Sequence, residues 1–222
     1  MTFYDKKRLW MESVLIIFFL LMTGIALYAY PLLPDRIIIH WNAAGEPDNF
    51  SSKNSVFLLP GLYLAVAILL TILPAIDSLS ENVKRFYREY YAFKIVLGVF
   101  FVALFIVTLL PNFGYYVDIA RTVVVMVSLL FISIGILFRN SKRNYFLGIR
   151  TPWTLSNDFV WEETHRIGKY AFVIYGIAMI ILSFLFRPQL LFLVFIGGIA
   201  IVVIFLFAYS YLLYKKVYKN KR

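Results

Sequence analysis

The chain has 222 residues, of which 62% are hydrophobic and 19% aromatic, and its mean hydropathy is +0.80. Soluble domains are about 45–50% apolar, so this composition excludes a soluble globular protein and makes lipid the solvent for much of the surface. The absence of cysteine excludes disulfides, thiolate metal sites and cysteine nucleophiles. The net charge of +10 is explained by basic loops on the cytoplasmic side of a membrane, without direct nucleic-acid binding.

Six apolar segments are long enough to cross a bilayer core about 30 Å thick, which takes about 20 helical residues. The sequence therefore predicts an all-α, polytopic protein of the cell membrane with six transmembrane helices. We place the spans at residues 10–30, 56–76, 91–110, 122–138, 170–186 and 189–214. We expect three regions: the first span with an outer motif loop (1–55), spans two to four (56–138), and a cytoplasmic motif loop with spans five and six (139–222).

The distribution of basic residues predicts the orientation of these spans. Lys94 lies within a span, and the connections on one side contain only Arg36, Lys53, Arg121 and Arg187. All the other Lys and Arg residues fall in the two terminal segments and in the connections on the other side. Because cytoplasmic loops carry the excess of Lys and Arg, we predict that both termini are cytoplasmic (N-in/C-in).

The loop at 31–55, between the first and second spans, is therefore expected outside. Its run Arg-Ile-Ile-Ile-His-Trp (36–41) predicts a short strand, and a turn is predicted at 42–45. In one interpretation His40, Asn42, Glu46 and Asp48 converge on a cation or polar ligand. In the other, Trp41 anchors at the membrane interface, while Asn42, Gly45 and Asp48 make turns. One histidine with scattered carboxylates is a weak metal signal, so we favour the second interpretation and assign no metal or cofactor.

The loop at 139–169 contains the run Gly-Ile-Arg-Thr-Pro-Trp-Thr-Leu at 148–155. Gly148 permits a backbone turn that other residues resist, and Thr151 before Pro152 is expected to be extended. Ser156 is a candidate N-cap for a helix that starts near residue 157. That helix would place four residues on neighbouring turns, namely Trp161, Thr164, His165 and Gly168.

This geometry predicts a re-entrant or interfacial segment with Trp153 and Trp161 at the depth of the lipid headgroups. Arg150 could meet a lipid phosphate, a carboxylate or the C-terminal end of a span. A functional role for Arg150, or a pairing of Glu162 with His165, is one interpretation. We favour the other, a structural clamp between the fourth and fifth spans, in which Glu162 and Arg166 form an ion pair on a helix surface.

The spans and the C-terminal tail contain further charged and small residues, for which we favour structural roles. Lys94 could be a functional charge within the membrane, but we expect it to snorkel to the cytoplasmic headgroups. The basic tail after residue 214 is expected to contact anionic membrane lipid. Small residues offer close helix approach at Gly98, Gly135, Gly176, Gly197 and Gly198. The chain contains no nucleotide-binding loop, HExxH or GxSxG motif, and we predict that it is not an enzyme.

The inner run 148–155, with Val160-Trp161 and Thr164-His165 downstream, resembles the signature of the SdpI family of bacterial membrane proteins. The outer loop, from Leu33-Pro34 through His40-Trp41-Asn42 to Asp48, is similar to a small domain of unknown function that often precedes the SdpI region. Together the two stretches carry the resemblance over nearly the full chain. The candidate contacts for a ligand or partner are His40, Trp41, Asn42, Gly45, Asp48, Gly148, Arg150, Thr151, Pro152, Trp153, Trp161 and His165.

The resemblance implies a non-enzymatic protein that confers immunity to a membrane-active peptide toxin of the SdpC type. The immunity protein of the family's founding system also sequesters a cytoplasmic transcriptional repressor when toxin is bound, and the resemblance implies the same role here. We expect the peptide to meet the outer loop and lipid-facing helices, and the response to pass through the inner loop. The alternative is a transporter of lipid or small molecules, with His40, Asp48, Lys94 and Arg150 along a path. Against it, the spans hold almost no ionisable residues apart from Lys94.

Overall fold

The computed structural model describes residues 6–138 and 140–219, with side chains from residue 12 onward. Six of its helices are long and apolar enough to cross a membrane, which confirms the predicted number of spans. They are α1 (Lys6–Ala29), α2 (Leu58–Ile76), α4 (Tyr87–Leu109), α5 (Ile119–Phe138), α7 (Asp158–Leu185) and α8 (Pro188–Lys219). Because each span satisfies its own backbone hydrogen bonds, this architecture suits a hydrocarbon solvent.

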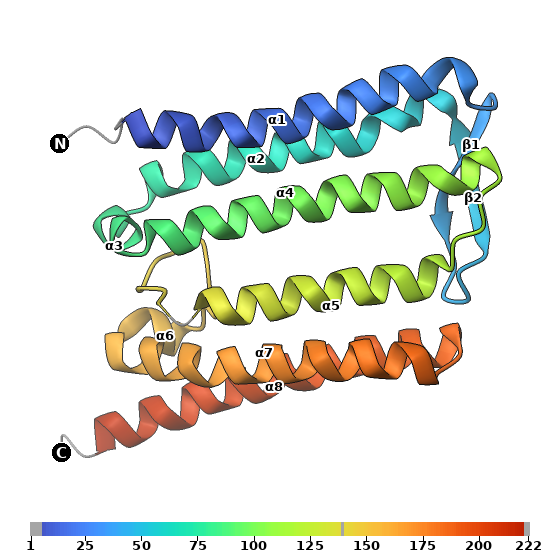
Figure 1. Cartoon of the computed structure of the whole chain (residues 1–222). Coiled ribbons are helices and arrows are strands. Elements are labelled where there is room, and N and C mark those ends of the chain that lie inside the picture. Colours follow the sequence, from blue (N-terminus) through green and yellow to red (C-terminus); the bar gives the residue numbers. More distant parts are fainter. Residues whose placement is uncertain (1–5, 139, 220–222) are drawn as a thin grey trace.

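Short elements close the two ends of the bundle. At one end, β1 (Arg36–Trp41) and β2 (Pro47–Ser52) form a hairpin, and we call this the hairpin end (Figure 1). At the opposite end, which also holds the start of α1 and the end of α8, lie α3 (Ser80–Arg85) and α6 (Pro152–Ser156) (Figure 1), and we call this the motif end. Three 3-10 turns complete the structure: η1 (Tyr30–Leu32), η2 (Lys53–Phe57) and η3 (Leu110–Phe113).

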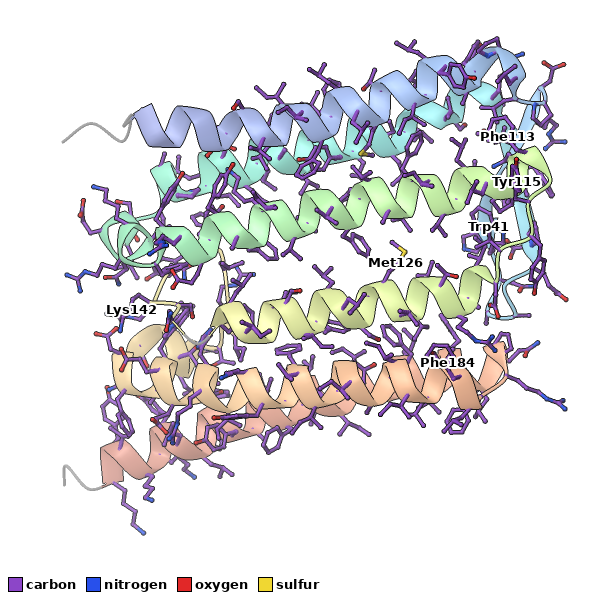
Figure 2. The ribbon with its side chains drawn as sticks, in the orientation of Figure 1. Trp41, Phe113, Tyr115, Met126, Lys142 and Phe184 are labelled. Carbon is purple, nitrogen blue, oxygen red and sulfur yellow. The ribbon has the colours of Figure 1, made fainter. Side chains whose placement is uncertain are left out.

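The spans form two groups of three helices, and α4 packs against α5 to join them (Figure 1). The first group is α1, α2 and α4, with Met22, Tyr63 and Phe105 in its core. The second is α5, α7 and α8, with Tyr175 and Met179 in its core. Met126 of α5 lies between α4 and α5 (Figure 2). Many apolar side chains of α8, such as Leu193, Ile201 and Ile204, are exposed, as expected for a surface solvated by lipid.

Glycine permits close helix approach at four of the five predicted positions. A Cβ added to Gly176 would lie 2.7 Å from the Ser128 carbonyl oxygen, and one added to Gly135 would lie 2.9 Å from that of Lys169. Gly98 and Gly198 face the rings of Phe18 and Tyr175 at similarly short range. The prediction is wrong for Gly197, where an added Cβ would meet nothing within 4 Å.

Lys94 does not snorkel to the headgroups, and that prediction is wrong. Its side chain is only 2% exposed and forms an ion pair with Glu12 of α1, whose side chain is 20% exposed. Glu12 lies within the first predicted span, at 10–30, and is the counter-charge that the snorkelling prediction left out. The charge is neutralised inside the bundle, so the ammonium has no need to reach lipid phosphates. The orientation of the spans and the division into three regions stay predictions. The basic residues Arg139, Lys221 and Arg222 lie outside the described residues.

Candidate functional site

The hairpin is an antiparallel pair in which Arg36 lies opposite Ser52 and Trp41 opposite Pro47. The strand predicted at 36–41 is confirmed as β1. Its partner β2 was not predicted, because the run Pro-Asp-Asn-Phe-Ser-Ser is poor in strand-forming residues. Pairing with β1 therefore decides the conformation of this segment.

The tip of the hairpin is a turn built by Asn42 and Gly45, as predicted. The Asn42 side-chain oxygen accepts hydrogen bonds from the backbone N–H groups of Ala44, at 2.9 Å, and Glu46, at 3.1 Å. Gly45 has a φ of 80°, which favours glycine. A Cβ added there would lie 3.2 Å from the Cβ of Ala120 in α5. The hairpin, which follows α1, thus reaches the second helix group.

The polar side chains of the hairpin form two separate pairs. His40 Nδ1 lies 2.5 Å from Asp48 Oδ1, and the pair is largely exposed. Asn42 donates from Nδ2 to Glu46 Oε2 at 3.1 Å. Within the described residues, no group of three or more His, Asp or Glu side chains could hold a metal ion. The arrangement offers an exposed polar face.

The base of the hairpin is fixed to the bundle by side chains from other segments. The Ile38 N–H donates to Asn112 Oδ1 at 2.8 Å, and Asn112 Nδ2 donates to the Thr108 carbonyl at 3.1 Å. Lys53 and Asp35 form an ion pair at 3.0 Å. Sequence reasoning missed Asn112, whose only signal was a polar residue after Pro111 at the end of a span. The hairpin is therefore docked on η3, the turn that follows α4.

The motif loop centres on Gly148, Trp161 and His165. Gly148 has a φ of 123°, and a Cβ added there would overlap with His165 Nε2 and lie 3.1 Å from the Trp161 ring. The His165 Nε2 accepts from the Ile149 N–H at 2.9 Å, and its Nδ1 lies 2.8 Å from the Trp161 carbonyl, to which it donates. These two bonds specify a neutral ring with its proton on Nδ1. Glycine is needed at 148 because the backbone packs directly on these rings.

The headgroup depth expected for Trp161 stays a prediction, but its side chain does not face lipid. The indole is buried, donates from Nε1 to the Ser141 carbonyl at 3.0 Å, and stacks on His165 with a centroid distance of 4.1 Å. The prediction that four residues share neighbouring turns of one helix is confirmed. The buried residues of α7 include Trp161, Thr164, His165 and Gly168. Trp153 packs instead on α8, with its ring centroid 4.8 Å from that of Phe207.

Thr151 is extended, as predicted, with φ −113° and ψ 161°. It caps the short helix α6, in which Pro152 takes the first position, and its hydroxyl lies 3.0 Å from that of Ser210 in α8. The helix α6 was not predicted. The predicted N-cap is also wrong: Asn157 caps α7 by accepting from the Val160 N–H, while Ser156 donates to the Trp153 carbonyl within α6.

Charged residues of the motif loop pair differently from expectation. Arg150 is exposed and donates from Nη1 to the Tyr145 carbonyl at 2.6 Å. Glu162 pairs with Lys142 at 2.7 Å, and Arg166 pairs with Glu163, so neither predicted pairing of Glu162 forms. Lys142 lies at the motif end beside α6 (Figure 2). The run 148–155 thus joins α7 and α8 through buried groups. It is a structural clamp between the fifth and sixth spans, whereas the prediction placed the clamp between the fourth and fifth.

Six apolar spans, a docked hairpin and a clamped loop define a multi-pass protein of the cell membrane. Residues 140–210 match the SdpI/YfhL protein family, and residues 17–64 match a domain of unknown function, DUF1648. The chain is 28% identical to Immunity protein SdpI of Bacillus subtilis (strain 168) over 205 residues, which is 92% of this chain and 95% of that protein. No solved structure matches. The resemblance to the SdpI family is thereby confirmed, with the domain of unknown function preceding the SdpI region.

Proposed function

We propose that this chain is a membrane immunity protein that protects the cell membrane from a membrane-active peptide toxin of the SdpC type, without enzymatic chemistry. The observation that carries the proposal is similarity to Immunity protein SdpI along 92% of the chain, which includes both the hairpin and the motif loop. A match confined to the spans would have supported a shared membrane architecture alone.

In this proposal the hairpin end faces outward and is the first surface that an arriving peptide meets. The charge asymmetry of the connections supports this orientation. The exposed side chains of His40, Asp48 and Phe50 are available for contact. Gly45 and Asn42 shape the tip of the hairpin, and we assign them to its geometry.

The motif end would carry any cytoplasmic response, including contact with a transcriptional repressor. Trp161 and His165 are buried and belong to the clamp. A partner would have to meet exposed residues of the same loop, and we assign this contact to Arg150, Pro152 and Tyr145. Gly148 and Thr151 would hold that surface in place. Trp153 and the basic residues of α8 are assigned to membrane lipid.

Expression of the chain alone in a toxin-sensitive bacterium tests the proposal by survival counts. We expect protection without any added substrate, and we expect substitution of Trp41 by Ala to reduce it at normal protein abundance. The matched control is Trp153→Ala, which removes an aromatic side chain at the opposite end. If a well-expressed chain gives no protection against any toxin of this class, immunity is not its function.

A second candidate function, transport, is favoured by one observation: the ion pair of Glu12 and Lys94 within the first helix group. Intramembrane charges commonly mark substrate or proton pathways. The other residues expected on a path are far from one another, because His40 and Asp48 lie at the hairpin end and Arg150 at the motif end. Protection that survives neutralisation of both charges would exclude this candidate.

A further inference from the structure

A cavity of about 130 Å³ lies beneath β1, between the hairpin and the ends of α2 and α4. Its lining includes Ile37, Trp41, Leu59, Phe105, Thr108 and Leu109. The strand β1, the 3-10 turns η2 and η3 and the helices α2 and α4 all contribute, so the cavity depends on docking of the hairpin. In Figure 2, Trp41 lies at this end of the bundle, near Phe113 and Tyr115.

A backbone amide and two hydroxyls around the cavity already have partners. The Ile38 N–H is bound by Asn112, the Thr108 hydroxyl donates to the Leu104 carbonyl at 2.9 Å, and the Ser55 hydroxyl donates to that of Ser51 at 2.9 Å. No charged side chain belongs to the lining within the described residues. An occupant therefore gains little from hydrogen bonds or charge, and the cavity selects an apolar group.

The size of the cavity limits the occupant to one compact group. An apolar cavity of about 150 Å³ lined by Leu, Ile and Phe stays dry and accepts benzene. A cavity of about 130 Å³ fits a side chain of the size of Leu or Phe. Two lining residues, Ile39 and Leu58, are 40% and 65% exposed, so the cavity opens to the surroundings between β1 and the start of α2.

We propose that this cavity is the anchor pocket for one large apolar side chain of the peptide toxin. The inference rests on the proposed function, which brings a membrane-active peptide to this end of the protein. Such a peptide carries apolar side chains into the membrane interface, where the mouth of the pocket lies. Phe113 and Tyr115 are exposed nearby and extend the apolar surface along which the rest of the peptide would run. Because the pocket is already formed, the protein loses little conformational entropy when a side chain fills it.

The absence of cysteine makes a single-cysteine test direct. Thr108→Cys places a thiol in the cavity wall, and Leu32→Cys places a control thiol on an exposed site at the same end. The probes are benzyl methanethiosulfonate and the anionic sulfonatoethyl reagent, applied to the purified protein in lipid nanodiscs. We expect the benzyl-to-sulfonate rate ratio to be at least tenfold higher at 108 than at 32. Equal ratios would overturn the apolar pocket.

Competition with the toxin peptide used in the survival assay identifies the occupant. Bound peptide should slow benzyl labelling at least fivefold at 108 and leave position 32 unchanged. Thr108→Phe, which fills the cavity, should weaken peptide binding at least tenfold, whereas Leu32→Phe should not. If Thr108→Phe misfolds, the labelling measurement still decides.

The failures of the two proposals are distinguishable. A folded Thr108→Phe protein that still binds the peptide and protects cells would overturn the anchor pocket and leave the immunity function intact. A wild-type chain that never protects cells would overturn both. If benzyl labelling at position 108 is selective but bound peptide does not slow it, the cavity is assigned to a lipid acyl chain. That result would overturn the peptide as occupant.

Discussion

Lys94 of α4 and Glu12 of α1 form an ion pair inside the helix bundle, with Nζ 2.6 Å from Oε2 and 2.8 Å from Oε1. The hydroxyl of Thr71 in α2 lies 2.9 Å from the same nitrogen. The three donors of the ammonium therefore have three acceptors. This cluster joins all three helices of the first group and fixes α1, which leads directly into the hairpin.

Breaking the pair should cost more than removing it. Glu12→Gln leaves a buried ammonium without its counter-charge, and we expect a loss of stability of about 3 kcal/mol. Glu12→Gln combined with Lys94→Met leaves no isolated charge, so it should lose clearly less than the Glu12→Gln variant alone. Thermal unfolding midpoints of the purified Glu12→Gln, Lys94→Met and double variants measure these losses. If the losses of the two single variants add in the double variant, the two charges are not energetically coupled.

Gly148→Ala should destabilise the motif loop strongly. The substitution strains a backbone with φ 123° and drives a Cβ into the His165 ring, and together these should cost at least about 2 kcal/mol. The control is Gly197→Ala, where an added Cβ meets nothing within 4 Å and helix propensity favours Ala by up to about 1 kcal/mol. Unfolding midpoints should move in opposite directions. A tolerated Gly148→Ala would mean that the loop does not pack on His165.

Arg150→Lys should preserve the stability of the motif loop. The guanidinium makes one hydrogen bond, to the Tyr145 carbonyl, and a Lys ammonium can also donate to a single acceptor. We expect Arg150→Lys to change the free energy of unfolding by less than about 1 kcal/mol, as is usual for exposed sites. If Lys fails as badly as Ala at normal abundance, Arg150 binds an anion through a bidentate fork.

Thiol labelling decides the orientation of the spans. Cysteine at Asn49, in the exposed strand β2, should react with an impermeant maleimide in intact cells. The matching inner position is Ser156, which is exposed. Cysteine at 156 should react only after permeabilisation. The reverse pattern would place both termini outside.

Several features of the fold follow from local sequence. The spans are recognisable because a lipid core requires about 20 consecutive apolar residues, and that requirement is read directly from composition. The strand at 36–41 and the turn at Gly45 follow from local propensity and from the need for positive φ. The shared face of Trp161 and His165 on α7 follows from helical spacing, which places the two residues one turn apart.

By itself the sequence determined the six spans, the strand β1 and the alignment of Trp161 and His165 on one face of α7, because each depends on neighbours within a few residues. Tertiary structure alone decided which groups meet. Lys94 pairs with a residue 82 positions away, and Ile38 binds a side chain 74 positions away. The helical spacing of Trp161 and His165 would be the same at a membrane interface and in a protein core. The burial of Trp161 is therefore decided by packing against Gly148. The cavity under β1 also exists only in the assembled bundle, because residues of β1, η2, α2, α4 and η3 enclose it.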